Sequence, residues 1–376
     1  MKNKIRKALR NCLFAYHQRK HERFYHQVMK MNGIKDESVE GEKAWIARWS
    51  QFGAIAKPSQ YRVFSHYIGP NIDIVPEDIS HDFIEPVLNP FAFTGYYADK
   101  NVFDKLFPDG YFPKTVLRKM NGFYYDSDYQ LLSLNDGKLQ TMLGILEYDK
   151  LILKPSVDGM SGAGVQMFVR KKDRGGYYNN ESDKLTYDYI QNRCGHDIII
   201  QEAVEQSEYI NQFNPTSVNT LRLSLYRSVI DDKCHITGAI MRIGRKGSVV
   251  DNAHAGGCYV GINQDGTFCH EVLDQYGRKR TVFNGVDFSV DFKYPNWEKV
   301  LDFGKSIGKY VPHHRLLALD IVLDKDSNPH LIEFNCRYYS SWLFQYTTGP
   351  AFGPFTQEIL EYCKDNSAYN YAYLKI

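Results

Sequence analysis

The sequence lacks the features that define several large classes of protein. No run of about 18 apolar residues is present, so no membrane-spanning helix is expected, and no signal-peptide core is visible. The net charge is only +2, which argues against a dedicated nucleic-acid binder. No internal repeat is apparent. The cysteines follow no CxxC or zinc-ligand spacing, which predicts reduced thiols in the cytoplasm; they are Cys12, Cys194, Cys234, Cys258, Cys269, Cys336 and Cys363.

The charge that is present is unevenly distributed along the 376 residues, a length sufficient for two or three domains. Residues 1–30 carry nine Lys or Arg and one acid, Glu22. Apolar residues recur in this segment at helical spacing, at Ile5, Ala8, Leu9, Cys12, Leu13 and Tyr16. Two interpretations of this basic helix remain open. It rests on the inner face of an anionic membrane as a peripheral contact, or it packs its apolar stripe on the same protein.

The order of the predicted elements indicates an α+β fold. Residues 41–135 are rich in aromatic residues and prolines, which favours short helices and loops over a sheet. Strands are predicted at 151–155, 166–172, 197–204 and 219–229 and in a hairpin at 317–335, and helices at 181–193, 297–310 and 355–363. The predicted regions are a basic, mainly helical N-terminal region at 1–100, two lobes at 101–200 and 201–350, and a C-terminal helix and tail at 351–376.

The hairpin LALDIVLDKDSNPHLIEFN, at 317–335, carries acids where a core should be apolar. A turn centred on Ser327 sets Asp320 opposite Glu333, with Cβ atoms about 5 Å apart. Strict alternation places Glu333 and Asn335 on the same face as Leu331. Two buried carboxylates at this distance repel unless a cation lies between them, and Mg²⁺ with Asn335 as a further oxygen ligand fits the set. A solvated hairpin face with scattered acids is the alternative.

A glycine-rich segment, KPSVDGMSGAGV at 154–165, lies between two predicted strands. Its glycines allow a hairpin loop to bring backbone N–H groups close to an anion, and Lys154 adds a positive charge at the base of the loop. The segment is not a GxxxxGK[ST] phosphate loop. A flexible hairpin tip remains the alternative for the segment taken alone.

The order of strand lysine, glycine loop, apolar strand and late acidic hairpin resembles the ATP-grasp superfamily. The resemblance implies two α+β lobes that clasp ATP, with two Mg²⁺ ions that Mn²⁺ could replace. The residues it implies for nucleotide binding are Lys154, Gly159, Ser161, Gly162, Gly164, Gln201, Glu202, Val204 and Glu208, and those for metal are Asp320, Glu333 and Asn335. An earlier phosphate-binding lysine is expected at Lys114 or Lys119, with Lys114 preferred for its spacing. Asp158, an anion within the loop, departs from the pattern and must point away from phosphate or contact metal or solvent.

Three further segments resemble the sugar-transfer-associated branch of that superfamily, which is linked to bacterial surface polysaccharide. They are SVNTLRLSLYRS at 217–228, GSVVDNAHAGGCYVGINQDG at 247–266 and YPNW at 294–297. The resemblance covers roughly residues 100–345. It implies a carboxylate–amine ligase that forms a carbon–nitrogen bond through an acyl phosphate. Its substrates would be a carboxylate-bearing sugar or glycan precursor and an amine or amino acid, without nucleic acid, and a homodimer remains open.

The implied chemistry needs a cation that binds the substrate carboxylate. Arg222 is the candidate, because it lies on the polar face of a strand whose other face is apolar. A structural salt bridge is the alternative for this residue. Asn219 and Asn252 are candidates to complete the clamp, and His254 is a candidate base or a structural loop residue. Gly256 and Gly257 are expected to allow close approach of the backbone to the substrate. A phosphotransferase and a non-catalytic ATP-binding partner of glycosyltransferases remain as alternative functions.

Overall fold

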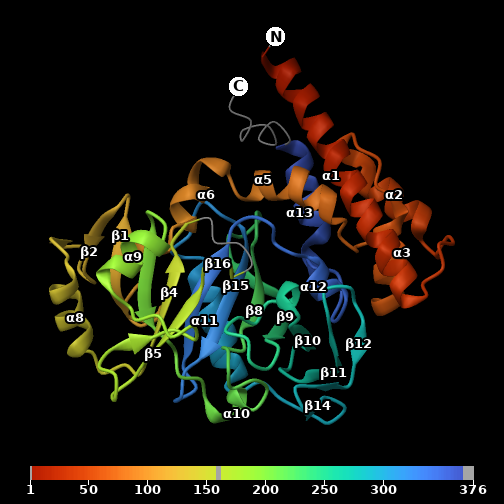
Figure 1. Ribbon diagram of the computed structural model, residues 1–376. Coiled ribbons are helices and arrows are strands. Elements are labelled where there is room, and N and C mark those ends of the chain that lie inside the picture. The colour runs from red at the N-terminus through yellow and green to blue at the C-terminus, as the bar shows by residue number, and fades with distance from the viewer. Residues whose placement is uncertain (1, 158–161, 367–376) are drawn as a thin grey trace.

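The computed structural model describes residues 2–157 and 162–366, and its first third is helical (Figure 1). Proline and glycine divide this region into short segments, as the composition predicts. Its elements are α1 (Lys2–Asn32), α2 (Glu42–Trp49), η1 (Ser50–Phe52), α3 (Pro58–Ile68), α4 (Glu77–Ile79), η2 (Ser80–Ile84), α5 (Glu85–Leu88), α6 (Phe91–Ala98), η3 (Lys100–Val102) and α7 (Phe103–Leu106).

An antiparallel sheet follows, in the order β3-β2-β1-β7-β4-β5-β6. Its strands are β1 (Thr115–Met120), β2 (Phe123–Tyr125), β3 (Leu131–Leu132), β4 (Lys150–Pro155), β5 (Gln166–Arg170), β6 (Tyr177–Tyr178) and β7 (Ile198–Glu202), and α8 (Asp136–Gly144) and α9 (Tyr187–Arg193) belong to the same lobe. We call this unit the small lobe. The prediction of helices and loops throughout 41–135 is therefore wrong for β1, β2 and β3. It rests on how often proline occurs, and this does not reveal that β1 pairs with β7 inside the sheet.

A second antiparallel sheet, in the order β12-β11-β10-β9-β8-β15-β16, forms the large lobe. Its strands are β8 (Leu221–Arg227), β9 (Cys234–Ile243), β10 (Cys258–Ile262), β11 (Phe268–Leu273), β12 (Lys279–Arg280), β15 (Leu316–Leu323) and β16 (Pro329–Asn335), with a small β13 (Val282–Phe283) and β14 (Val286–Asp287) pair. Around it lie α10 (Glu208–Asn211), η4 (Ala253–Ala255), α11 (Trp297–Ile307), α12 (Trp342–Gln345), η5 (Gly353–Phe355) and α13 (Thr356–Asp365).

The hairpin of β15 and β16 pairs Asp320 with Glu333, and this predicted register is confirmed. The register shifts after this pair, because Ile321 lies opposite Leu331 and leaves Ile332 as an extra residue. Such a bulge reverses the alternation of faces along a strand. Leu331 therefore packs in the core of the large lobe, and the prediction that it shares a face with Glu333 is wrong.

Helix α1 has two unequal halves. Its C-terminal half packs on the body through Tyr25 and Val28, which are fully buried. Its N-terminal half projects away from the rest of the molecule (Figure 1). There Leu9, Leu13 and Tyr16 are exposed to 42%, 39% and 66%, so the interpretation that this stripe packs on the same protein is wrong for these residues. In the described part of the chain, no helix is long and apolar enough to cross a membrane.

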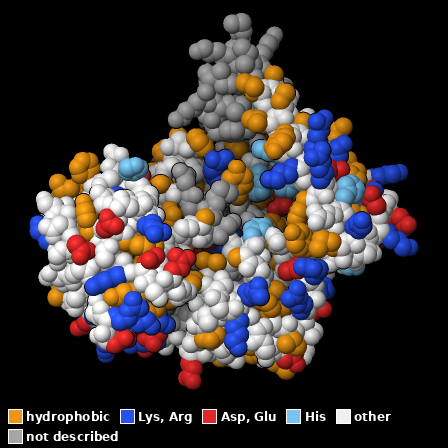
Figure 2. Space-filling view, in the orientation of Figure 1, with side chains coloured by type: hydrophobic (Ala, Val, Ile, Leu, Met, Phe, Trp, Pro, Cys, Tyr) orange, Lys and Arg blue, Asp and Glu red, His pale blue; other side chains and the backbone are white. Residues whose placement is uncertain are grey.

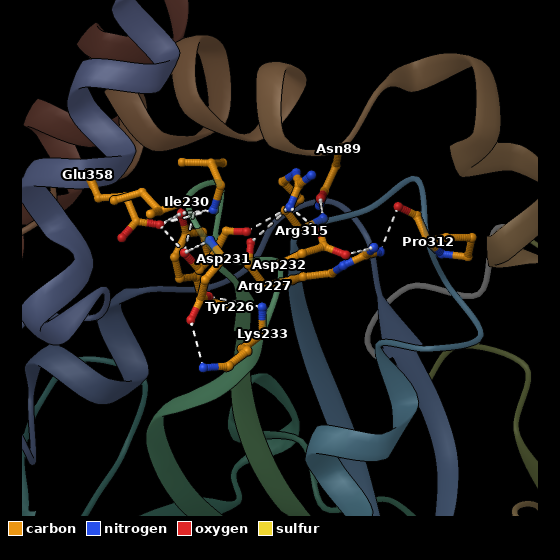
Figure 3. Close-up of polar contacts among 12 residues, drawn as sticks. Asn89, Tyr226, Arg227, Ile230, Asp231, Asp232, Lys233, Pro312, Arg315 and Glu358 are labelled. Atoms are coloured by element: carbon orange, nitrogen blue, oxygen red, sulfur yellow. Dashed lines mark hydrogen bonds and ion pairs between the residues drawn. The ribbon is translucent and has the colours of Figure 1, made fainter.

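The helical N-terminal region and α13 are joined to the ends of β8 and β15 by a polar network (Figure 3). The side chain of Asn89 accepts from the backbone N–H of Arg315 at 3.0 Å and also contacts the backbone of Leu316. The Glu358 carboxylate accepts from Tyr226 Oη at 2.8 Å and from the N–H of Val229 at 3.0 Å. These contacts attach α13 and the residue that follows α5 to the large lobe, beside the sheet that carries the acidic hairpin.

Candidate active site

A cavity of about 1680 Å³ lies between the two lobes. Strands β4, β5 and β7 contribute side chains from the small lobe, and β8, β9 and β16 from the large lobe. Figure 2 shows the hollowed face between the two lobes, with histidine side chains gathered beneath α1. Ordinary ligand pockets span about 300–1,000 Å³, so this cavity has room for more than one substrate.

Two lysines, Lys100 and Lys154, meet at one side of the cavity. Lys154 lies on β4 and is 7% exposed. The N–H of Lys100 donates to the carbonyl of Ser156 at 2.9 Å, which holds η3 next to the end of β4. Burial, reinforced by the charge of Lys100, lowers the pKa of Lys154 to about 8. The Lys100 Nζ atom lies 3.3 Å from Glu333 Oε2, which connects the cationic side of the cavity to the acidic hairpin.

Lys100 was not identified from the sequence, and the two lysines that were proposed lie elsewhere. Lys114 is exposed, and its backbone N–H donates to Glu202 Oε1 at 2.8 Å. Lys119 is buried inside the small lobe, where its Nζ lies 3.5 Å from the carbonyl of Ile190. Neither side chain lines the cavity. The number of residues between each lysine and Lys154 does not indicate which lysine reaches the cavity. Lys100 lines the cavity because η3 is docked on the end of β4.

The glycine loop is described from Gly162 onward, and Asp158, Gly159 and Ser161 lie outside the described residues. Gly162 and Gly164 have φ values of 76° and 75°, in the left-handed region that glycine adopts without strain. A Cβ on Gly162 would lie 2.9 Å from Val250 Cγ1 of the large lobe. Gly162 also lines the cavity, so the described end of the loop lies close to the opposite lobe.

The connection after β7 forms the wall predicted to bind the nucleotide base. Gln201, Glu202, Val204 and Glu208 all line the cavity. Gln201 Nε2 donates to the carbonyl of Pro113 at 3.0 Å, which fixes β7 against the start of β1. Gln201 and Glu202 end β7, and Glu208 begins α10, so these residues lie where the chain passes from the small lobe to the large lobe.

Asp320 is paired with two arginines beneath the cavity floor. It is fully buried, and its two oxygens accept from Arg222 Nε and a terminal nitrogen of Arg222, each at 2.8 Å. Arg242, which the sequence did not single out, lies 3.3 Å from Asp320 and 3.2 Å from Asp251. Burial alone would raise the pKa of Asp320, but the charges of Arg222 and Arg242 outweigh it and lower the pKa. Both arginines also line the cavity, so Arg222 makes a structural salt bridge and still borders the space for a substrate.

Two of the predicted magnesium ligands, Glu333 and Asn335, line the cavity. Asn335 Nδ2 is buried without a hydrogen-bond partner, so its amide is free to turn its oxygen toward a cation. Asp320, by contrast, already accepts one hydrogen bond from Arg222 at each oxygen, so a metal ion there would share the carboxylate with the guanidinium. Among the described residues, no group of three or more His, Cys, Asp or Glu side chains is arranged to hold a metal ion. The oxygens of Glu333 and Asn335 are of the kind that Mg²⁺ binds, and they fit an ion that would take its other ligands from phosphate oxygens and water.

The remaining predicted residues divide between the cavity and the core. Asn252 and His254 line the cavity, and the Asn252 side chain accepts from the N–H of His254 at 3.0 Å. Asn219 is fully buried, and its Nδ2 donates to the carbonyls of Ile210 and Asn214, so its place in the carboxylate clamp is wrong. A Cβ on Gly257 would meet the Ile243 carbonyl oxygen at 2.8 Å. That glycine accommodates neighbouring backbone, and neither it nor Gly256 lines the cavity.

The model of the sugar-transfer associated ATP-grasp family matches residues 79–360. No curated protein matches the chain. Similar solved structures include a D-cycloserine synthetase, with 13% identity over 73% of this chain and 73% of that chain and a TM-score of 0.40. Another is D-alanyl-alanine synthetase A from Vibrio cholerae, with 12% identity, 72% and 66% coverage and a TM-score of 0.40.

An L-amino acid ligase from Bacillus licheniformis is also similar, with 13% identity and a TM-score of 0.33. The match covers 65% of this chain but only 42% of that one. The family model spans most of the chain, including both lobes and the cavity between them. This protein therefore belongs to the sugar-transfer associated ATP-grasp family.

Proposed function

We propose that this protein is an ATP- and Mg²⁺-dependent carboxylate–amine ligase that modifies a cell-surface polysaccharide or its precursor, for example by joining an amino acid to a uronic acid. One observation carries the proposal. A single cavity between two lobes gathers the cations Lys100, Lys154 and Arg222 together with the oxygen donors Glu333 and Asn335. A phosphate chain, a metal ion and a carboxylate are the ligands that such a set accommodates.

Each group in the cavity has a role in this reaction. Lys100 and Lys154 bind and orient the phosphate chain of ATP. Glu333 and Asn335 would hold Mg²⁺, which would supply positive charge to the phosphates. Arg222 uses Nε and one terminal nitrogen for Asp320, which leaves its other terminal nitrogen to bind the substrate carboxylate. Asp320 and Arg242 keep that guanidinium in place, as positioning residues.

The reaction proceeds in two steps. The substrate carboxylate attacks the γ-phosphorus of ATP, and ADP leaves with the bond electrons to give an acyl phosphate. An amine then attacks the acyl carbon, loses a proton and expels inorganic phosphate, so that an amide forms. The first step requires the carboxylate to lie beside the phosphates. The short distance from Lys100 to Glu333 and the bordering position of Arg222 support this arrangement.

The test incubates the full-length protein with ATP, Mg²⁺ and mixtures of uronates and amino acids, and follows ADP release and product mass. Hydroxylamine is added in parallel, because it traps acyl phosphates as hydroxamates. A ligase yields a hydroxamate with its carboxylate substrate alone, and Glu333→Gln should lose most of this yield. A phosphorylated product that resists hydroxylamine would establish a phosphotransferase instead. ATP binding without any acceptor-dependent turnover would leave the non-catalytic binding partner.

We also propose that the N-terminal half of α1 contacts an anionic membrane at its cytoplasmic face, where a lipid-linked glycan precursor would lie. The exposed positions of Leu9, Leu13 and Tyr16 support this contact, because they recur at helical spacing in a segment rich in Lys and Arg. An apolar stripe bordered by basic residues is the pattern of a helix that lies in the headgroup region.

A further inference from the structure

The loop after β16 forms one wall of the cavity and adopts an unusual backbone conformation. Tyr338 and Ser340 have φ values of 53° and 63°. Residues with a side chain adopt this left-handed region infrequently, and bulky ones pay strain for it. Strained residues of this kind persist where the surrounding structure holds them, and they concentrate at ligand sites. Both residues line the cavity.

A buried carboxylate holds this loop in place. Glu85, on α5, accepts from the N–H of Tyr338 at 2.8 Å and from the N–H of Tyr339 at 3.4 Å. His81 Nδ1 lies 2.6 Å from the same carboxylate. Burial alone would raise the pKa of Glu85, but the His81 charge and the two N–H donors lower it. Tyr339 is 1% exposed, so its side chain anchors the loop in the core.

The anchored loop presents aromatic and cationic side chains to the cavity. Tyr338 is 53% exposed although its backbone is fixed. The guanidinium of Arg337 lies 5.3 Å from the centre of the Tyr338 ring and 5.2 Å from that of Phe91. Trp342 and His254 also line the cavity, and their ring centroids lie 6.3 Å apart. The guanidinium of Arg337 gives this group of side chains a positive charge, which favours an anionic ligand.

We propose that Arg337, Tyr338, Trp342 and His254 form a subsite for the pyranose ring of the sugar substrate and for an anionic group on it other than the carboxylate that reacts beside Arg222. This inference deepens the proposed function and rests on it. The faces of a sugar ring expose C–H groups of slight positive charge, which pack against the negative face of an aromatic ring. The planar guanidinium of Arg337 binds a carboxylate or phosphate through two hydrogen bonds. The cavity is large enough to hold such a sugar beside a nucleotide.

The experiment titrates three sugars into the full-length protein by calorimetry, in the presence of a non-hydrolysable ATP analogue and Mg²⁺. The sugars are methyl glucuronoside, glucose 1-phosphate and methyl glucoside. One of the two anionic sugars should bind at least about tenfold more tightly than the neutral one, and which of them does so identifies the anionic group. Equal binding of all three sugars, or no binding of any, would overturn the proposal.

Variants test the two kinds of contact separately. Arg337→Gln should abolish the preference for the anionic sugar, and Tyr338→Ala should weaken all sugars about tenfold, whereas Tyr338→Phe retains binding because the ring remains. The matched control is Arg174→Gln, whose guanidinium stacks on Tyr178 at 4.1 Å outside the cavity and should have no effect. Unchanged sugar preference in Arg337→Gln would overturn the subsite. Affinity for the ATP analogue is measured for the parent and for every variant. A parent that does not bind the analogue would contradict the proposed function, whereas a parent that binds it but does not prefer an anionic sugar would contradict only the subsite.

Discussion

Lys154 is a buried cation in an environment that favours binding of an anionic ligand. It lies beside a second cation, Lys100, and its pKa falls from 10.5 to about 8. One pKa unit corresponds to about 1.4 kcal/mol, so keeping this side chain charged costs the folded protein about 3 kcal/mol. An anionic ligand between the two lysines would offset that cost. The arrangement is typical of a site that trades stability for binding.

Lys154→Met tests this trade. The variant should be more stable than the parent by about 1–3 kcal/mol at pH 7 without nucleotide, and it should lose ATP binding. Because the folded-state pKa of Lys154 is lowered, the unfolded chain binds more protons between pH 8 and pH 10.5, and the parent gains stability as pH rises. The advantage of the variant should therefore shrink by about 1 kcal/mol between pH 7 and pH 9. Urea unfolding and calorimetric titration measure the two effects, and Lys119→Met, outside the cavity, should leave ATP binding intact.

Asp320 represents the opposite case, a buried charge that already has its partners. Asp320→Asn should destabilise the protein by about 3–5 kcal/mol, because Arg222 and Arg242 would remain buried with reduced compensation. The folded-state pKa of Asp320 is lowered, so its stabilising contribution is present above the unfolded pKa of about 4 and is lost as pH falls below it. The difference in unfolding free energy between parent and variant should thus be constant from pH 5 to pH 8 and shrink below pH 4. Asp291→Asn, at a highly exposed position, serves as the control, and an equal loss in both variants would contradict the role of the buried pair.

At the scale of elements, residues of one strand or one helix differ in whether they face the core, the cavity or solvent. The bulge at Ile332 turns Leu331 into the core and leaves Glu333 and Asn335 at the cavity. Strict alternation would have placed all three on one face. In α1, the C-terminal half is buried against the body while the N-terminal half presents Leu9, Leu13 and Tyr16 to solvent. Exposed apolar residues in a segment rich in Lys and Arg indicate a surface that contacts an anionic membrane.

The membrane contact of α1 is tested with vesicles. The parent should sediment with vesicles that contain phosphatidylserine and not with purely zwitterionic ones, and binding should weaken with added salt because screening acts over about 10 Å at 0.1 M. Leu9→Glu combined with Leu13→Glu should abolish binding by removing apolar contact and reducing the positive charge. Ile145→Glu changes an apolar residue that is 79% exposed on the small lobe, and it should bind like the parent. Equal binding of the parent to both kinds of vesicle would contradict electrostatic docking.

At the scale of the whole molecule, the two lobes have separate hydrophobic cores. The core of the small lobe includes Leu117, Leu153 and Phe168, and that of the large lobe includes Leu223 and Leu319. The Lys100–Glu333 pair connects η3, which is docked on the end of β4 of the small lobe, to β16 of the large lobe. Separate cores joined by short connections permit relative motion, so the cavity should open and close around its ligands.

This separation predicts stepwise unfolding of the protein without nucleotide. All four tryptophans lie outside the small lobe, at Trp45, Trp49, Trp297 and Trp342, so their fluorescence does not report on that sheet. The urea midpoint from circular dichroism should therefore fall below the midpoint from tryptophan fluorescence. A non-hydrolysable ATP analogue with Mg²⁺ should bring the two midpoints together, because a ligand held by both lobes couples their unfolding. Coincident midpoints without nucleotide would show that the lobes unfold as one unit.

The sequence alone determined the α+β class, the family and the register that sets Asp320 opposite Glu333. These features depend on local pattern, because pleat alternation, turn residues and the order of motifs are properties of neighbouring residues. The same patterns located Lys154, Glu333 and Asn335, which the structure places in the cavity.

Only the tertiary structure decided which residues far apart in the chain meet. The docking of η3 on the end of β4 brought Lys100 into the cavity in place of Lys114, and the pairing of β8 with β15 and β9 set Arg222 and Arg242 around Asp320. Asn219 was turned into the core by carbonyls that no motif specifies. The physical reason is that burial, charge pairing and lowered or raised pKa values depend on contacts between distant segments, and one sequence pattern is compatible with many such contacts.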